Sequence, residues 1–203
     1  MKALIIKDLL NLKGQYKIII AIFVFYAMIS FGSSDASFLF GMISVIMVLL
    51  TITSISYDER SKWDKYALTM PVNRQDIVIS KYLLGLILAS VALVLNLIFT
   101  LLFSDLSTSE SVAVPFALFG VSLLFLALVL PPLFKYGVEK GRFIMMMIFF
   151  VPTGVIIIAS KMGNISIGND ILNNLPYILV ISLIIAVGIS IKASLRIYNN
   201  KEM

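Results

Sequence analysis

Residues 77–103 read IVISKYLLGLILASVALVLNLIFTLLF, and this stretch decides the fold. It carries a single charged residue, Lys81, and shows no alternation of apolar and polar positions. A helix that spans the hydrocarbon core of a bilayer needs about 17–25 mostly apolar residues. The stretch is therefore a spanning helix whose Lys81 end projects beyond the lipid. Without alternation it does not fit a strand of a membrane barrel.

The rest of the chain repeats this pattern. The chain has 203 residues, of which 60% are hydrophobic and 13% charged, whereas a soluble domain is about 25% charged. These numbers predict an all-α membrane protein with six transmembrane helices within residues 18–203. The six apolar runs are Ile18–Gly32, Phe38–Ser56, Ile77–Phe103, Val112–Phe134, Phe143–Ser160 and Leu175–Leu195.

The basic residues predict the orientation of the chain. If both termini are cytoplasmic, the inner segments hold 15 of the 16 Lys and Arg residues, and only Lys161 lies outside. Cytoplasmic loops of membrane proteins are enriched in Lys and Arg. We therefore expect a multi-pass protein of the cell membrane with both ends inside. This asymmetry accounts for the net charge of +5, so we expect no nucleic acid as a partner.

Residues 1–17 form a separate amphipathic segment. Apolar side chains recur at helical spacing between lysines, which is typical of a helix that lies in the membrane interface. Gly14 marks a bend before the first span. The alternative is a solvated start to the first spanning helix. The apolar positions are Leu4, Ile5, Leu9, Leu12 and Tyr16.

Polar and proline positions within the runs suggest local features. Pro131-Pro132 is expected to end the fourth span, because proline cannot donate the helical hydrogen bond. Pro152 predicts a kink or break in the fifth, either as a gate or as a packing kink. Asn96 is the costliest of these polar groups to bury, and is therefore expected to contact a neighbouring helix or a transport pathway.

The chain offers no visible catalytic group. It lacks His and Cys, so Cys/His zinc sites and histidine acid–base chemistry are excluded. It also lacks the Gly-x-x-x-x-Gly-Lys-Ser/Thr loop that cradles nucleotide phosphates. We expect no catalytic, cofactor or metal residues, and the missing intramembrane carboxylate argues against an ion-driven transporter.

The segment between the second and third runs carries the most information. Residues 57–77 read YDERSKWDKYALTMPVNRQDI and contain the only Trp of the chain. A helical pattern over Asp58–Leu68 places Trp63, Tyr66, Ala67 and Met70 on one face. This pattern fits either a helix anchored in the membrane interface or a helix that docks on a soluble partner.

The end of this segment predicts the start of the next span. Pro71 ends the short helix, because the residue before a proline is disfavoured in a helix. Asn73 then resembles a helix N-cap, with Asp76 at the third helical position.

Residues 57–82 resemble the signature of ABC-2 type transporter permeases, and in particular the small bacterial branch that includes the permeases of phenol-soluble modulin exporters. The resemblance rests on the segment above together with IVISKY at residues 77–82. It implies the fold of ABC-2 or type V exporters, with six spans, an N-terminal interfacial helix and a partly re-entrant loop between spans five and six.

The resemblance also implies partners and a docking site. A cytoplasmic coupling helix at residues 58–70 would dock on a separate ABC ATP-binding subunit, which would hold ATP and Mg²⁺ in place of this chain. Two permease subunits, as a homodimer, would pair with two ATPases in the lipid bilayer. The docking residues implied are Asp58, Glu59, Arg60, Lys62, Trp63, Asp64, Lys65, Tyr66 and Met70.

These observations favour a permease subunit of an ABC exporter, not itself an enzyme, that moves amphipathic or hydrophobic peptides such as phenol-soluble modulins. An antibiotic or a lipid is the alternative substrate. The alternative function is a non-transporting bacteriocin-immunity or membrane scaffold protein. An intramembrane enzyme is the third class, and the chain shows no group that would serve it.

Overall fold

The computed structural model of the chain describes residues 2–33, 37–67, 69–70, 72–103, 108–162 and 169–200, and these residues form helices and turns without strands. The elements in chain order are α1 (Lys2–Leu12), the 3₁₀ turn η1 (Lys13–Gln15), α2 (Tyr16–Ser33), α3 (Ser37–Arg60), α4 (Trp63–Ala67), α5 (Arg74–Phe103), α6 (Thr108–Met162) and α7 (Asn169–Asn199).

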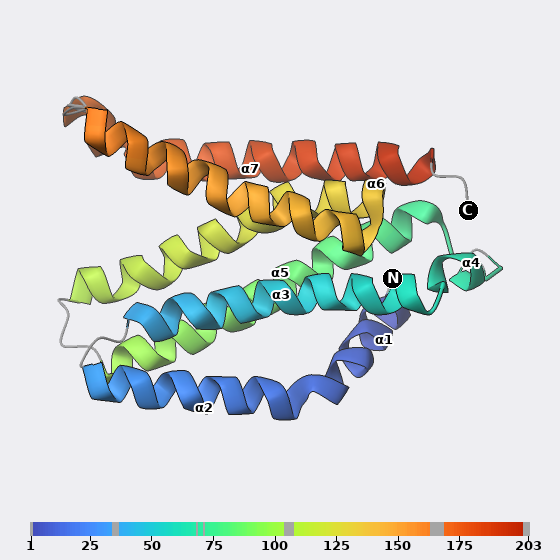
Figure 1. Ribbon diagram of the computed structural model, residues 1–203, viewed down its shortest axis with the longest axis horizontal. Helices are drawn as coiled ribbons and strands as arrows, with labels where there is room; N and C mark the ends of the chain where they lie inside the picture. The colour runs from blue at the N-terminus through green and yellow to red at the C-terminus, as the bar shows by residue number, and fades with distance from the viewer. Residues whose placement is uncertain are drawn as a thin grey trace.

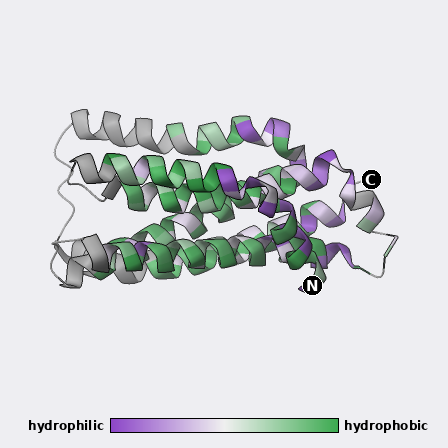
Figure 2. Ribbon diagram, turned by 90° about the horizontal axis from the view of Figure 1, so that it is seen from below, coloured by the Kyte–Doolittle hydropathy of each residue, from purple (hydrophilic) through white to green (hydrophobic). Residues whose placement is uncertain are grey.

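The long helices run side by side along one axis, and the shorter elements gather at one end (Figure 1). Gly14 lies in η1, where the chain changes direction between α1 and α2. Hydrophilic residues collect at the end that holds α1 and the last turns of α7, while the long helices are mostly apolar (Figure 2). We call this end, which also carries α4, the charged end.

Five segments of the described residues are long and apolar enough to cross a membrane, and the prediction of six spans is therefore not confirmed. The fourth and fifth predicted runs both lie in α6, and the first segment extends back over α1. The five segments are Lys2–Ile29, Leu39–Arg60, Arg74–Thr100, Val112–Ile148 and Val180–Asn199.

A break at Gly137 divides α6 into a first arm, residues 108–136, and a second arm, residues 138–162. Gly137 has φ 79° and ψ 172°, which are not helical angles. At this point the chain turns back on itself, so that the second arm returns along the bundle (Figure 1). Pro152 lies within the second arm, and its side chain falls outside the described residues. Residues 163–168, part of the loop expected to be re-entrant, also lie outside the described residues. Residues 169–174 of that loop belong to α7.

The prediction that Pro131-Pro132 ends a span is wrong, because α6 continues through both prolines to the break at Gly137. A proline at position 131 removes the N–H that would bond to the carbonyl of Ala127. The hydroxyl of Ser190, from α7, donates to that carbonyl instead at 2.5 Å. A hydrogen bond from a neighbouring helix therefore replaces the missing one.

The predicted helix over Asp58–Leu68 is also wrong in extent. Asp58 to Arg60 form the last turn of α3, and the chain then turns at Lys62, which has φ 51°. Only five residues remain for α4. The predicted start of the next helix is confirmed: α5 begins at Arg74, and the N–H of Asn73 donates to the carboxylate of Asp76 at 3.4 Å.

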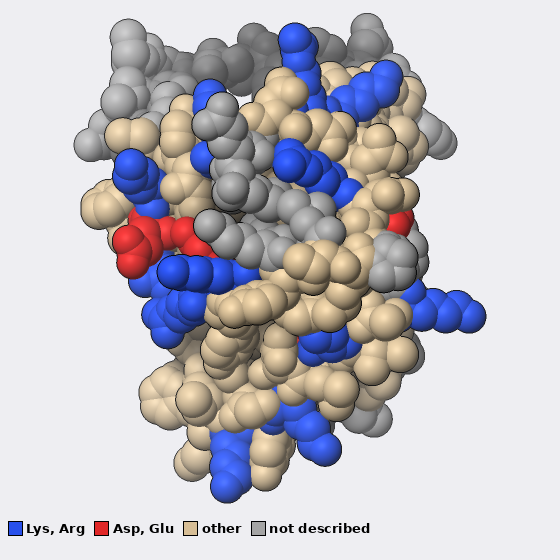
Figure 3. All heavy atoms as spheres, turned by 90° about the vertical axis from the view of Figure 1, so that its right-hand side faces the viewer, with Lys and Arg blue, Asp and Glu red and all other residues tan. Residues whose placement is uncertain are grey.

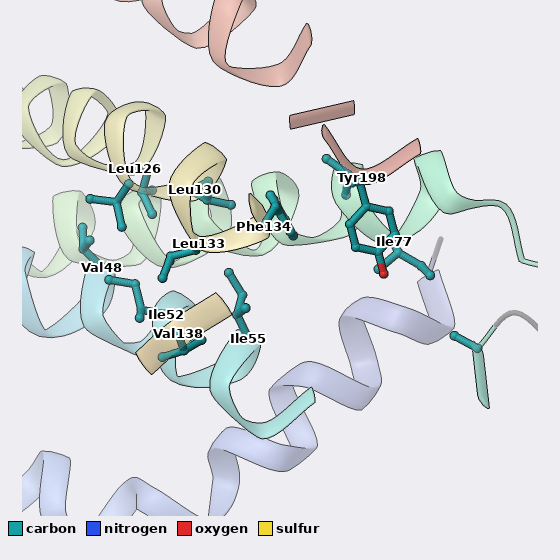
Figure 4. Close-up of a cluster of buried hydrophobic side chains, with 13 residues drawn as sticks. Val48, Ile52, Ile55, Ile77, Leu126, Leu130, Leu133, Phe134, Val138 and Tyr198 are labelled. Atoms are coloured by element: carbon teal, nitrogen blue, oxygen red, sulfur yellow. The ribbon is translucent and has the colours of Figure 1, made fainter. Parts of the chain in front are cut away.

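The main core cluster packs α3, α4, α5, α6 and α7 together. Side chains of α3, α5, α6 and α7 point toward one another in it (Figure 4). The rings of Phe134 and Tyr198 meet edge to face at 5.7 Å. Ala67 of α4 is fully buried in the same cluster, and Trp63 packs against it. Thus α4 is seated on the bundle and does not hang free from it.

Candidate functional site

Four charged side chains meet inside the charged end, and we call them the charge cluster: Lys7, Asp8, Asp58 and Lys81. The ammonium of Lys81 lies 2.8 Å from both carboxylate oxygens of Asp8 and 2.5 Å from Oδ2 of Asp58. It also donates to the hydroxyl of Ser54 at 2.9 Å. Lys81 of α5 therefore joins α1 to α3.

Lys7 completes the cluster from its outer side. Its ammonium lies 2.6 Å from Oδ1 of Asp58 and 3.0 Å from Asp8. It also stands 4.5 Å from the centre of the Trp63 ring, a distance that allows a cation–π contact. The side chain of Lys7 is 22% exposed, whereas those of Asp8 and Lys81 are 1% and 4% exposed. Two cations thus balance two anions at a largely buried site.

This cluster was not predicted from the sequence, because only the apolar positions of residues 1–17 were considered and not Asp8. The buried residues of α1 are Leu4, Asp8 and Leu12, one above another on a single face. Leu9 and Tyr16, which the apolar pattern grouped with them, are 41% and 50% exposed. In a membrane protein the apolar face can turn toward lipid, so a carboxylate can occupy the inward face.

A second contact joins the α3–α4 corner, residues 58–67, to the break in α6. The carboxylate of Glu59 accepts the N–H of Val138 at 2.6 Å. A Cβ atom at Gly137 would stand 2.5 Å from the other oxygen of Glu59. The break in α6 and the end of α3 are therefore fitted closely to each other.

The structure divides the residues predicted to dock on a partner into three groups. Asp58 is buried in the charge cluster, Glu59 is exposed but accepts the N–H of Val138, and Trp63 is half-buried. Exposed at the surface are Arg60, Lys62, Tyr66 and Met70. The side chains of Asp64 and Lys65 lie outside the described residues. The predicted face of the helix is thus split, with Ala67 buried and Tyr66 62% exposed.

The charged end is strongly basic at its surface (Figure 3). Ten Lys and Arg side chains of the described residues are exposed, against the carboxylates of Glu59 and Glu139 only. The charge cluster holds two carboxylates and two ammonium groups, so it does not change this basic excess. The surface that remains favours a partner with negative charge.

Asn96 lies in the contact between α5 and α3. Its amide nitrogen donates to the hydroxyl of Ser44 at 3.0 Å and to the carbonyl of Phe40 at 3.3 Å. The side chain is 1% exposed. Of the two roles expected for Asn96, the structure shows the contact with a neighbouring helix.

Replacing Asn96 with Ala is therefore expected to lower the free energy of unfolding by about 1 kcal/mol, the usual size of a hydrogen bond between membrane helices. Thermal unfolding in detergent measures this. Ser90→Ala is the control, since the hydroxyl of Ser90, among the residues that the structure describes, bonds to the Leu86 carbonyl of its own helix and to no other helix. Equal unfolding temperatures for the two variants would contradict the assignment.

An apolar groove lies between α3 and the first arm of α6. Its volume is about 370 Å³, and its lining includes Val45, Val48, Val121 and Phe125. The hydroxyl of Ser122, which also lines it, donates to the carbonyl of Leu118 in its own helix. The groove therefore offers apolar surface to a ligand and little free hydrogen-bonding capacity.

The described residues contain no group of His, Cys, Asp or Glu that could hold a metal ion. Long apolar helices, a basic end and a buried charge cluster together define a multi-pass membrane protein of the all-α class.

The chain matches the family described as ABC-2 family transporter protein over residues 3–199, and it belongs to this family. It is accordingly a permease subunit of an ABC transporter, a membrane transport component that is not itself catalytic. Membership implies association with an ABC ATP-binding subunit and with the membrane. No curated protein and no solved structure shows significant similarity to the chain.

Proposed function

We propose that this chain is the membrane subunit of an ATP-driven exporter, coupled to its ATPase through the α3–α4 corner. The observation that carries the proposal is the corner itself. It exposes the aromatic side chain of Tyr66, with the exposed Met70 shortly after it, while Ala67 and the charge cluster fix it to the bundle. A movement imposed on Tyr66 therefore reaches α1, α3 and α5.

The topology proposed for this exporter has the charged end in the cytoplasm and six spans, with the two arms of α6 as the fourth and fifth. The distribution of Lys and Arg supports this orientation. The short connection at Gly137 supports two antiparallel spans, because a helix of 55 residues would be about 80 Å long if it were straight, far more than a bilayer is thick.

The docking surface proposed consists of Tyr66 and Met70 with Arg60 and Lys62 beside them. Aromatic anchors carry much of the binding energy at protein interfaces, and charges at the rim set orientation and salt dependence. A groove on the ATPase with an apolar floor and acidic edges would suit this surface. ATP and Mg²⁺ would be bound by that subunit.

Replacing Tyr66 with Ala is expected to weaken the complex with the ATPase by about 2 kcal/mol, or about 30-fold, the loss typical of an aromatic anchor. Affinity can be measured by titrating the ATPase onto the permease in nanodiscs. ATP hydrolysis by the assembled complex gives a second readout.

Tyr16→Ala is the matched control, because Tyr16 is also half-exposed but belongs to the start of α2 and not to the corner. If Tyr66→Ala binds and stimulates the ATPase as the unchanged chain does, the docking surface is wrong. If the unchanged chain binds no ATPase in nanodiscs, the exporter proposal is wrong. A non-transporting immunity or scaffold protein is then the better interpretation.

The substrate proposed is an amphipathic or hydrophobic peptide of the phenol-soluble modulin kind, moved at the interface of two copies of this chain. The apolar groove beside Phe125 and the sparse charge within the spans support an apolar path. Stimulation of ATP hydrolysis by an amphipathic helical peptide tests this, with a scrambled peptide of the same composition as control. If a lipid or an antibiotic stimulates ATP hydrolysis and the peptide does not, the proposed substrate is the lipid or the antibiotic and not the peptide.

A further inference from the structure

The contact between Glu59 and the break in α6 joins two parts of the chain that are far apart in sequence. Glu59 is in the last turn of α3, and Val138 is the first residue of the second arm of α6, 79 positions later. The N–H of Val138 donates to the Glu59 carboxylate at 2.6 Å. One side chain of the α3–α4 corner therefore holds the start of another helix.

The position of this carboxylate is specific to a helix N-terminus. The first N–H groups of a helix have no partner within the helix, and the helix dipole favours a negative charge there. Glu59 supplies both the acceptor and the charge. It acts on the second arm as a capping residue does, except that it comes from a different helix.

Gly137 makes room for this contact. Its backbone angles lie in a region that is essentially restricted to glycine. A side chain at position 137 would also meet Glu59, since its Cβ would stand 2.5 Å from Oε1. Gly137 and Glu59 are thus complementary, because the missing side chain of Gly137 leaves space for the carboxylate of Glu59.

The corner and the second arm also share a packed core. Val138 and Leu133, on either side of the break, lie in the same buried cluster as Ile55 of α3 and Ala67 of α4. Packed interiors transmit displacement because they have few voids. The second arm is therefore in contact with the corner both by packing and by a charged hydrogen bond.

We propose that Glu59 is a positioning residue that fastens the second arm of α6 to the α3–α4 corner, so that the two move as one body when the ATPase acts. This inference rests on the proposed function. The chain itself connects the corner to α3 and α5. The contact made by Glu59 adds a connection to α6, through which a movement of the corner can be transmitted.

The second arm carries a surface that such a movement would displace. Phe143, Met146, Met147 and Phe150 follow one another at helical spacing, and each is at least 56% exposed. Movement of the second arm would therefore carry this flexible apolar stripe with it.

The test measures one distance within the complex of permease and ATPase in nanodiscs. The chain has no cysteine, so Ser61→Cys and Met147→Cys introduce the only two sites for nitroxide labels. Both positions are exposed, one in the corner and one in the second arm. Pulsed electron resonance then gives the distance between the labels without nucleotide and with ATP plus vanadate.

The label distance is expected to stay constant between the two nucleotide states in the otherwise unchanged chain. It is expected to shift or broaden with nucleotide in Glu59→Ala, and to stay constant again in Glu59→Gln, which keeps an acceptor oxygen. Glu139→Ala is the matched control, because Glu139 is an exposed carboxylate one residue beyond Val138. It is expected to behave like the unchanged chain.

Two results would overturn the inference: a distance that changes with nucleotide in the unchanged chain, or one that stays constant in Glu59→Ala. If Glu59→Ala does not fold, Glu59→Asp, which is one methylene shorter, takes its place with the same expectation. Binding of the ATPase is measured on the same samples. If the ATPase does not bind, the proposed function is contradicted. If the ATPase binds but the corner and the second arm of the unchanged chain move apart, only the role proposed for Glu59 is contradicted.

Discussion

Replacing Lys81 with Met is expected to lower the free energy of unfolding by about 3–5 kcal/mol, the usual cost of removing one partner from a buried ion pair. The loss is large because two carboxylates, Asp8 and Asp58, both depend on the same ammonium group. These carboxylates are 1% and 8% exposed, so water cannot replace the missing cation. Thermal unfolding in detergent, followed by the fluorescence of the single Trp, measures the change.

Two comparisons make this prediction specific. Lys7→Met is expected to cost only about 1 kcal/mol, because Lys7 is 22% exposed and Lys81 remains with both carboxylates. A triple variant with Asp8→Asn, Asp58→Asn and Lys81→Met is expected to recover most of the stability, since no buried charge is left unpaired. A Lys81→Met variant as stable as Lys7→Met would show that the charge cluster does not hold α1 in place.

Replacing Gly137 with Val is expected to lower the free energy of unfolding by about 3 kcal/mol. A side chain at these backbone angles costs about 1–3 kcal/mol by itself. The collision with Glu59 adds to this cost, because it displaces the carboxylate from the N–H of Val138 and leaves a polar group without its partner. Loss of helical circular dichroism on heating gives the measurement.

Gly188→Ala provides the comparison for Gly137. A Cβ atom at Gly188, within α7, would have no neighbour within 4 Å among the described residues, apart from the backbone of its own helix. Alanine is also the better helix former by about 1 kcal/mol, so Gly188→Ala is expected to be neutral or slightly stabilising. A Gly137→Val variant as stable as Gly188→Ala would mean that the break in α6 imposes no constraint on this position.

The positions of the long helices could be predicted from the sequence because hydropathy is a local property. The runs that begin near Phe38 and Ile77 became α3 and α5, and Asn73 marked the start of α5. The course of α6 could not be predicted in the same way. Its continuation through Pro131 depends on Ser190, whose hydroxyl arrives from 63 residues beyond Ala127.

The candidate site was predicted only at its surface. The sequence indicated Tyr66 and Met70, which the structure exposes, but it grouped Asp58 and Glu59 with them, although the carboxylates of both are bonded within the chain, to Lys81 and to Val138. A charged helix end looks the same in sequence whether its carboxylates face water or a buried ammonium. One signal was present: Lys81 stands alone in a long apolar run, and a charge in such a place requires a partner.

The pairing of Asp8 with Lys81 also sets an order of events during synthesis. Asp8 leaves the ribosome 73 residues before Lys81 does, and until then its carboxylate has no ammonium from α5 to meet. A carboxylate whose one near partner is the partly exposed Lys7 is costly to place in hydrocarbon, so the young N-terminal helix stays in contact with water. Docking of α1 is therefore a late step, which waits until the helix bearing Lys81 has been made and inserted.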